Sequence, residues 1–221
     1  MNNIDNLIVI GIIAVTAIFS FKGFNDPVFF DRYKFNVGAI EKARQQDRML
    51  TSAFLHGDIM HLIFNMYTFY FFSTFLLGYG VLFFFIVYFG AILAGNFLAL
   101  WTHKNQPYYS AIGASGGVSG ILFAAIILDS TIKIGIFPFP FQIWGWLFGI
   151  IYLAYSIYGM RSQLGNIGHE AHLGGAVFGV FCAVGFVWLF PNHPYVFFNF
   201  FYLILMLIPI AFLAYIVYKK K

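Results

Sequence analysis

Seven long runs of apolar residues, each close to the length of a membrane crossing, constrain this chain more than any other feature of its sequence. A helix needs about 20 residues to cross the apolar core of a bilayer. Only 9% of the residues are charged, against roughly 25% in soluble domains, so a soluble protein of this length could not cover its surface. The sequence therefore predicts an all-α, polytopic membrane helical bundle with helices at residues 7–21, 51–77, 81–101, 111–129, 143–160, 171–190 and 196–218.

The polar segments between these runs divide the chain unevenly. The longest, residues 22–50, carries most of the charges, whereas Gly78-Tyr-Gly80 leaves room only for a tight turn between antiparallel helices. We predict a six-helix core at 1–191 and an additional transmembrane helix with a basic tail at 192–221. The net charge of +4 lies in loops and at the C-terminus, where the lipid bilayer rather than nucleic acid is the expected partner.

Polar side chains inside apolar helices are candidates for function. His61 and Asn65 are four residues apart on the second predicted helix and so share one face. Ser115 lies near the start of the fourth helix and His172 near the start of the sixth. Because helices two, four and six cross the membrane in the same direction, all of these side chains are expected near one membrane face.

Pairs of glycines suggest how the fourth and sixth helices pack. Gly116 and Gly120 are four residues apart, and so are Gly175 and Gly179. Small residues at this spacing let two helix backbones approach closely within a membrane. We expect this packing to bring the serine of the fourth helix toward the histidine of the sixth.

A serine within hydrogen-bond reach of a histidine is the minimum for an activated hydroxyl nucleophile. His172 would take the serine proton during attack and return it to the leaving group. His61, Asn65 and the backbone at Gly113 could supply donors to the oxyanion of the tetrahedral intermediate. Glu170 is two residues from His172 and therefore does not share its helix face, so the sequence predicts a dyad.

These motifs together resemble the rhomboid family of intramembrane serine proteases. Gly113-Ala-Ser-Gly116 matches the family's Gly-x-Ser-Gly, and Ala171-His-Leu-Gly-Gly175 with Gly179 matches its Ala-His-x-x-Gly-x-x-x-Gly. The run from His56 through His61 to Asn65 matches the second-helix pattern that lines the oxyanion site. The resemblance covers roughly residues 5–191, and the last helix looks like the extra C-terminal helix of "six plus one" members.

Two positions depart from the family's pattern. Arg48 matches the arginine of a Trp-Arg motif in the family's first loop, but Asp47 stands in place of the tryptophan, which puts the anchoring of that loop in question. Ser119 stands where relatives often carry an aromatic residue that stacks on the catalytic histidine. Another group must therefore orient His172.

The resemblance implies a serine endopeptidase that cleaves transmembrane segments of single-span membrane proteins and needs no cofactor. A substrate helix would enter past the helix at 143–160 and unwind, so that Ser115 attacks an exposed carbonyl. Small residues are expected at the cleavage position. The loop at 161–170 is expected to act as a mobile lid.

Other interpretations stay open at this stage. Ser115 could be a helix-packing residue, and a non-catalytic rhomboid-like membrane chaperone or a small transporter could use the same bundle. His169-Glu-Ala-His172 is one residue short of the zinc-protease motif, so no metal is expected. His56 is expected to have a structural role, and His103, in a loop, is expected to be solvated.

The expected cellular membrane and the orientation of the protein in it rest on weaker features of the sequence. No targeting peptide is evident, which favours a bacterial inner membrane, and the resemblance implies an active site that opens to the extracytoplasmic side. The positive-inside rule favours the opposite, because all of the 12 lysines and arginines except Lys133 fall on the active-site side. Acidic residues intervene in the first loop, so the family's orientation is kept as the expectation. The oligomeric state is not predicted.

Overall fold

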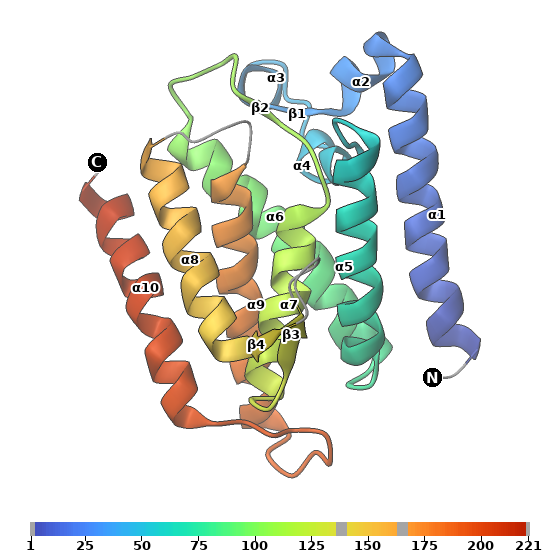
Figure 1. Cartoon of the computed structure of the whole chain (residues 1–221). Coiled ribbons are helices and arrows are strands. Elements are labelled where there is room, and N and C mark those ends of the chain that lie inside the picture. Colours follow the sequence, from blue (N-terminus) through green and yellow to red (C-terminus); the bar gives the residue numbers. More distant parts are fainter. Residues whose placement is uncertain (1–2, 136–140, 163–167, 220–221) are drawn as a thin grey trace.

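Helix α7 (Ser115–Leu128) is the buried centre of the structure, because all of its residues after Ser115 are buried. The computed structural model describes residues 3–135, 141–162 and 168–219, with side chains as far as Tyr215. Within these ranges, further long helices stand beside α7 in one bundle (Figure 1): α1 (Asn3–Asn25), α5 (Ile59–Leu77), α6 (Val81–Thr102), α8 (Gly145–Ser162), α9 (His169–Leu189) and α10 (Phe200–Lys219).

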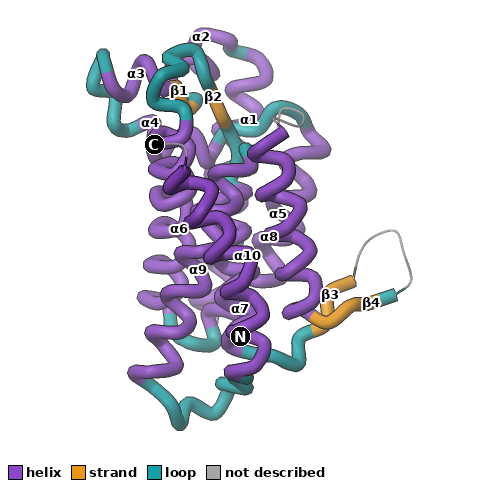
Figure 2. Tube along the Cα trace, turned by 90° about the vertical axis from the view of Figure 1, so that its left-hand side faces the viewer, coloured by secondary structure: helices purple, strands orange, loops and turns teal. Residues whose placement is uncertain are grey.

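Several of these helices have the length and composition of membrane spans. Among the described residues, α1, α5, α6 and α9 are each long and apolar enough to cross a bilayer. Helix α7 and the stretch Phe200–Tyr215 of α10 are apolar but shorter, and α8 runs alongside them in both views (Figure 1, Figure 2). The predicted all-α, polytopic bundle is confirmed, and the chain is an integral membrane protein. For α7, α8 and α10, a full crossing stays a prediction.

The second predicted helix, at 51–77, begins later than expected. Its first residues belong to the short helix α4 (Arg48–Thr51) and to the 3-10 turn η1 (Ser52–Phe54). Helix α5 begins only at Ile59, because the extended Asp58 caps it and its carboxylate accepts a hydrogen bond from the backbone N–H of His61 at 2.8 Å. The predicted start at residue 51 is therefore wrong. The other six predicted helices differ from the observed ones by no more than four residues at either end.

The long first loop folds into a layer of short elements over one end of the bundle (Figure 1). Asp26 and Asn36 cap its helices, with side-chain oxygens that accept hydrogen bonds from the backbone N–H groups of Phe29 and Ala39. Strand pairing also ties the layer to the loop before α7, since Phe35 lies opposite Ala111. The elements are α2 (Pro27–Tyr33), β1 (Phe35–Asn36), α3 (Val37–Glu41) and β2 (Ser110–Ala111).

Arg48 anchors this layer from within. Its side chain is buried, and Nη1 donates to the backbone carbonyls of Asp31 and Lys34, both at 2.7 Å. Asp47, at the position of the family's tryptophan, instead forms an exposed ion pair with Arg32 at 2.7 Å. An exposed ion pair of this kind contributes at most about 1 kcal/mol to stability. The hydrogen bonds of the buried Arg48 therefore stabilise the layer more than the ion pair does.

A second two-stranded sheet lies at the other end of the bundle. Strand β3 (Lys133–Gly135) pairs antiparallel with β4 (Gln142–Trp144), and the hairpin projects from the side of the bundle (Figure 2). Residues 143 and 144, the first two of the predicted fifth helix at 143–160, thus belong to a strand, and α8 begins at Gly145.

Glycines bring α7 and α9 into backbone contact. A Cβ atom at Gly175 would overlap the carbonyl of Gly116, and one at Gly179 would overlap the carbonyl of Gly120. A Cβ at Gly120 would also overlap Ala91 of α6. No side chain larger than hydrogen fits at these crossing points, so the two helices pack at the closest distance that backbones allow.

We expect Gly179→Ala to lower the free energy of unfolding by about 1–3 kcal/mol, because the added methyl group forces the two backbones apart. Gly185→Ala is the matched control on the same helix, since a Cβ there meets nothing within 4 Å, and it should leave stability unchanged or raise it by up to about 1 kcal/mol, because alanine favours a helix more than glycine does. Thermal unfolding of both variants in detergent micelles measures the difference. Equal losses would contradict close packing at the glycine contact.

Candidate active site

Ser115 and His172 meet where α7 and α9 begin. Ser115 is the first residue of α7, and His172 lies in the first turn of α9. Nε2 of His172 is 2.7 Å from Oγ of Ser115. Both side chains are partly buried. A neutral imidazole can accept the serine proton at this distance, which is the geometry that general-base activation requires.

Gly113 shapes the backbone just before the serine. Its φ of +115° lies in the region that favours glycine. A Cβ here would lie 3.0 Å from Nε2 of His61 and 3.8 Å from Oγ of Ser115, so the imidazole of His61 faces the serine across this glycine. The N–H of Gly113 donates to the carbonyl of Ser52 at 3.0 Å. This bond occupies the N–H in this structure, and the oxyanion role of Gly113 stays a prediction.

Asn65 lies one turn beyond His61 on α5. Its Nδ2 donates to the carbonyl of His61 at 3.0 Å, and only 8% of the residue is exposed. An amide nitrogen carries two hydrogens, so one donor remains beyond this bond. The first N–H groups of α7 have no acceptor within their own helix and also lie beside Ser115. The oxyanion roles of His61 and Asn65 stay predictions.

His56 links three parts of the structure behind the serine. Its ring is fully buried, with Nδ1 3.0 Å from Oγ of Ser20 and Nε2 accepting the N–H of Ala114 at 3.5 Å. Since the Ser20 hydroxyl donates to the carbonyl of Phe54, the proton on His56 belongs on Nδ1. The imidazole is therefore neutral. Burial, and then the nearby His61, lower the pKa of His56 to about 3, against the opposing effect of Asp58.

An aromatic ring lies against His172, but it comes from a different helix than the family pattern suggests. The ring of Tyr152, on α8, is 6.0 Å from the His172 ring between centroids, with the planes inclined by 28°. The Tyr152 hydroxyl is 2.7 Å from Oγ of Ser119. No pattern in the sequence singles out this contact, because Tyr152 is one of 14 tyrosines in an aromatic-rich chain.

Glu170 turns away from His172, as the spacing predicts. Its Oε1 is 3.0 Å from Nε2 of His103, and its Oε2 is 3.5 Å from the hydroxyl of Tyr109. The His103 ring stacks on Tyr109 with centroids 3.6 Å apart. His103 is only 6% exposed, so the expectation that it is solvated is wrong. The loop that contains it folds back onto the start of α9, where a buried carboxylate needs partners.

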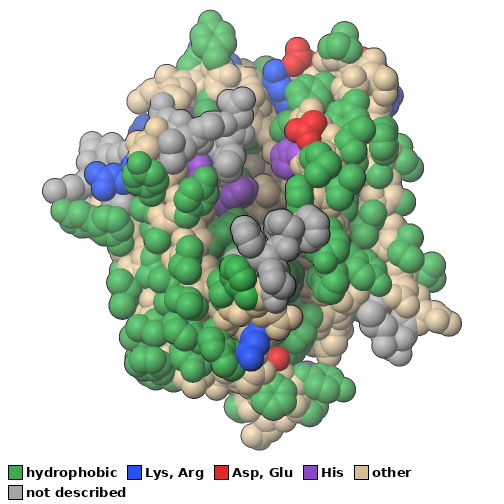
Figure 3. All heavy atoms as spheres, viewed as in Figure 1, with side chains coloured by type: hydrophobic (Ala, Val, Ile, Leu, Met, Phe, Trp, Pro, Cys, Tyr) green, Lys and Arg blue, Asp and Glu red, His purple; other side chains and the backbone are tan. Residues whose placement is uncertain are grey.

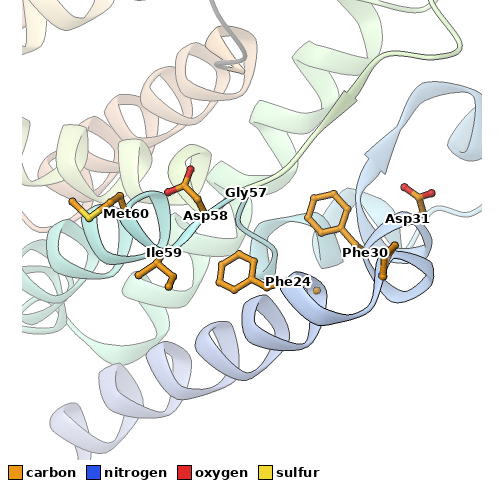
Figure 4. Close-up of a pocket in the computed structure, with 9 residues that line it drawn as sticks. Phe24, Phe30, Asp31, Gly57, Asp58, Ile59 and Met60 are labelled. Carbon is orange, nitrogen blue, oxygen red and sulfur yellow. The ribbon is translucent and has the colours of Figure 1, made fainter.

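Two hollows lie near these residues. Figure 3 shows a recess between α5 and α8 on the face of the bundle in view, with histidine side chains on both of its walls and hydrophobic side chains around it. A separate pocket of about 860 Å³ lies between the end of α1, α2 and the start of α5 (Figure 4). Phe24, Phe30 and Met60 line it together with Asp31 and Asp58. None of the residues that line this pocket is Ser115, His172, His61 or Asn65.

Two further expectations concern a metal site and a lid. Within the described residues, no group of three or more His, Cys, Asp or Glu side chains is placed to hold a metal ion. Half of the expected lid at 161–170, namely residues 163–167, lies outside the described residues.

Comparison with known proteins identifies similar sequences. The family model of the Rhomboid domain matches residues 43–189. Rhomboid protein 1, mitochondrial, of Saccharomyces cerevisiae is 32% identical over 136 residues, which are 60% of this chain and 39% of the yeast protein. RHOMBOID-like protein 12, mitochondrial, of Arabidopsis thaliana is 28% identical over 193 residues, 78% of this chain and 56% of the relative.

A third relative is the Presenilin-associated rhomboid-like protein, mitochondrial, of Rattus norvegicus, which is 34% identical over 137 residues. These residues are 60% of this chain and 36% of the rat protein. The chain thus spans between about a third and somewhat more than half of the length of these relatives.

The buried neutral His56 predicts a loss of stability in acid. Its pKa of about 3 lies below the ordinary value of 6.5, so between these values the unfolded chain binds a proton that the folded protein does not. The free energy of unfolding should therefore fall as the pH falls from about 6.5 toward 3. Unfolding of wild type and His56→Gln at pH 7, 6, 5 and 4 measures this, with a shallower slope expected for the variant. Parallel slopes would contradict it.

Proposed function

Because the chain belongs to the rhomboid family, we propose that it is an intramembrane serine endopeptidase that cleaves transmembrane segments of membrane proteins through the dyad of Ser115 and His172. The observation that carries this proposal is the 2.7 Å hydrogen bond between Nε2 of His172 and Oγ of Ser115. Family membership alone does not decide activity, since a non-catalytic relative can keep the same bundle.

The proposed chemistry passes through an acyl-enzyme. Oγ of Ser115 attacks the carbonyl carbon of the scissile peptide bond while Nε2 of His172 takes the hydroxyl proton. The imidazolium then gives this proton to the leaving nitrogen, the C–N bond breaks, and an ester on Ser115 remains. Water attacks the ester with His172 as base, and the proton returns to Oγ as the new carboxylic acid leaves.

The oxyanion of each tetrahedral intermediate needs donors that are already in place. We assign this role to the ring of His61, which faces Ser115 across Gly113, and to the amide of Asn65. Since the N–H of Gly113 is bonded to Ser52, the contribution of Gly113 is the space it leaves for the imidazole. The amide already bonds the His61 carbonyl, which holds it on the same face of α5.

The recess between α5 and α8 is the proposed path for the substrate (Figure 3). A single-span substrate helix would enter past α8 and unwind locally, because a helix hides its carbonyls in internal hydrogen bonds. By the resemblance to rhomboid proteases, small residues are expected at the cleavage position. The loop at 161–170 keeps its proposed role as a lid.

For the location of the protein, only the orientation in the membrane is proposed. The three relatives carry "mitochondrial" in their names and so give no support to the expected bacterial inner membrane. We keep the proposal that the active site opens to the extracytoplasmic side. The active site lies at the end of the bundle where α10 ends, opposite to the start of α1 (Figure 1). A reporter fused after Lys221 that lies in the cytoplasm would contradict this orientation.

Cleavage of a labelled single-span substrate by the purified protein tests the proposed function. Ser115→Ala should lower the rate by at least about 10⁴-fold, because it removes the nucleophile, and a metal chelator should have no effect. Asn65→Ala should lower it by about 10²–10³-fold through loss of an oxyanion donor. Labelling of the serine by a fluorophosphonate probe should disappear in Ser115→Ala.

Thr74→Ala is the matched control for Asn65→Ala, since Thr74 also donates to a backbone carbonyl of α5, that of Phe71 at 2.8 Å, but lies more than two turns from Asn65. It should retain the wild-type rate. Cleavage by Ser115→Ala would show that the serine is a packing residue. Wild type that neither cleaves several substrates nor reacts with the probe would favour the non-catalytic membrane chaperone.

A further inference from the structure

Among the described residues, no carboxylate is hydrogen-bonded to the His172 ring, in contrast to a triad of serine, histidine and aspartate. In such a triad the carboxylate on the second ring nitrogen fixes the tautomer and the orientation of the imidazole. Here the neighbouring Glu170 is bonded to His103 and Tyr109 instead. The orientation of His172 therefore depends on what packs against its ring.

We propose that Tyr152, held in place by Ser119, is the positioning residue for His172. The inference rests on the proposed function, because it assigns a role in orienting the base of that reaction. Tyr152 belongs to α8, Ser119 to α7 and His172 to α9, so three helices meet in this contact.

The ring of Tyr152 lies beside the imidazole in an offset stack. The centroids are 6.0 Å apart and the planes are inclined by 28°, which is within the range of offset-stacked aromatic pairs. Phe123 and Phe148 contact the same tyrosine ring, at 5.5 and 5.8 Å between centroids. These contacts restrict the rotation of the Tyr152 side chain and thereby the space in which His172 can turn.

The tyrosine hydroxyl fixes this ring relative to the nucleophile. It lies 2.7 Å from Oγ of Ser119, which is buried with 2% exposed. Ser119 is four residues after Ser115, one turn further along the same helix. One hydrogen bond therefore links the Tyr152 ring, which lies beside His172, to α7, the helix that carries Ser115. A buried hydroxyl pair is costly to break, because each partner then loses its bond without regaining water.

Serine at position 119 supports an arrangement in which the aromatic ring near His172 comes from α8 rather than from α7. An aromatic residue at 119 would reach the imidazole from α7 itself. With serine at 119, the side chain is too short to cover the ring, but its hydroxyl can hold a tyrosine that reaches the same imidazole from α8. Tyr152 and Ser119 together thus provide an aromatic contact from α8, in addition to the edge-on ring of His169, which lies 6.3 Å from the His172 ring on α9 itself.

Steady-state cleavage and fluorophosphonate labelling of four variants test the proposal. Tyr152→Leu should lower kcat and the labelling rate by about 10- to 100-fold, by analogy with the loss of a side chain that orients a metal-bound histidine, with KM changed less than about 2-fold. Tyr152→Phe and Ser119→Ala should each lower kcat by about 3- to 10-fold. Because both remove the same hydrogen bond, the double variant should be no slower than either single one.

A rescue separates positioning from a structural role. Ser119→Phe in a Tyr152→Ala background should recover much of the kcat that Tyr152→Ala loses, since it returns an aromatic ring to the imidazole from α7. Tyr158→Leu is the control on α8, where the tyrosine is 61% exposed, and it should keep the wild-type kcat. Thermal unfolding of every variant shows whether the loss of kcat follows the loss of folded protein.

The outcomes separate the two claims. If wild type cleaves and is labelled while Tyr152→Leu matches it, the positioning role is wrong and the proposed function stands. The positioning role is also wrong if the loss of kcat tracks the loss of folded protein. It is equally wrong if Ser119→Phe restores no kcat in the Tyr152→Ala background. If wild type neither cleaves nor is labelled, the proposed function fails and the positioning role fails with it.

Discussion

The contact between the backbones of α7 and α9 is the constraint on which the rest of the structure depends. Gly175 and Gly179 lie directly against the carbonyls of Gly116 and Gly120, so the helices that carry Ser115 and His172 approach as closely as two helices can. Within a bilayer such packing gains van der Waals contact rather than hydrophobic energy, and it needs small residues to do so. The close approach brings a serine and a histidine near the starts of these helices within hydrogen-bond distance of each other.

Polar groups gather at the same end of the bundle, and three of them have partners that offset their burial. Arg48 donates to backbone carbonyls of the first loop, His56 bonds Ser20, and Glu170 bonds His103. Burying such groups unpaired would cost several kcal/mol each, as would leaving irregular backbone exposed to lipid. The first loop and the loop before α7 thus form a hydrogen-bonded cap under which a polar reaction site can exist next to an apolar bundle.

Sequence reasoning predicts the parts of this structure that local pattern determines. Long apolar runs locate the helices, and a common crossing direction places Ser115 and His172 at one face. The rest depends on contacts between distant segments. Asp58 stops α5 from extending back through residues 51–58, and His103 is drawn inward by a carboxylate 67 residues away. The partner of the Gly113 N–H, Ser52, is set by how the first loop folds. None of these contacts produces a periodic pattern of residues in the sequence.

The contact between Tyr152 and His172 shows why a motif position is a weak guide to activity when it is considered alone. On the proposed assignment, the base needs an aromatic ring near it in space, whichever helix supplies that ring. Ser119 lacks that ring, yet its hydroxyl holds one that comes from α8 at 2.7 Å. The missing aromatic residue at 119 is therefore no argument that the chain is inactive. The argument for activity has to be made from the reacting atoms, where Oγ of Ser115 and Nε2 of His172 already lie at hydrogen-bond distance.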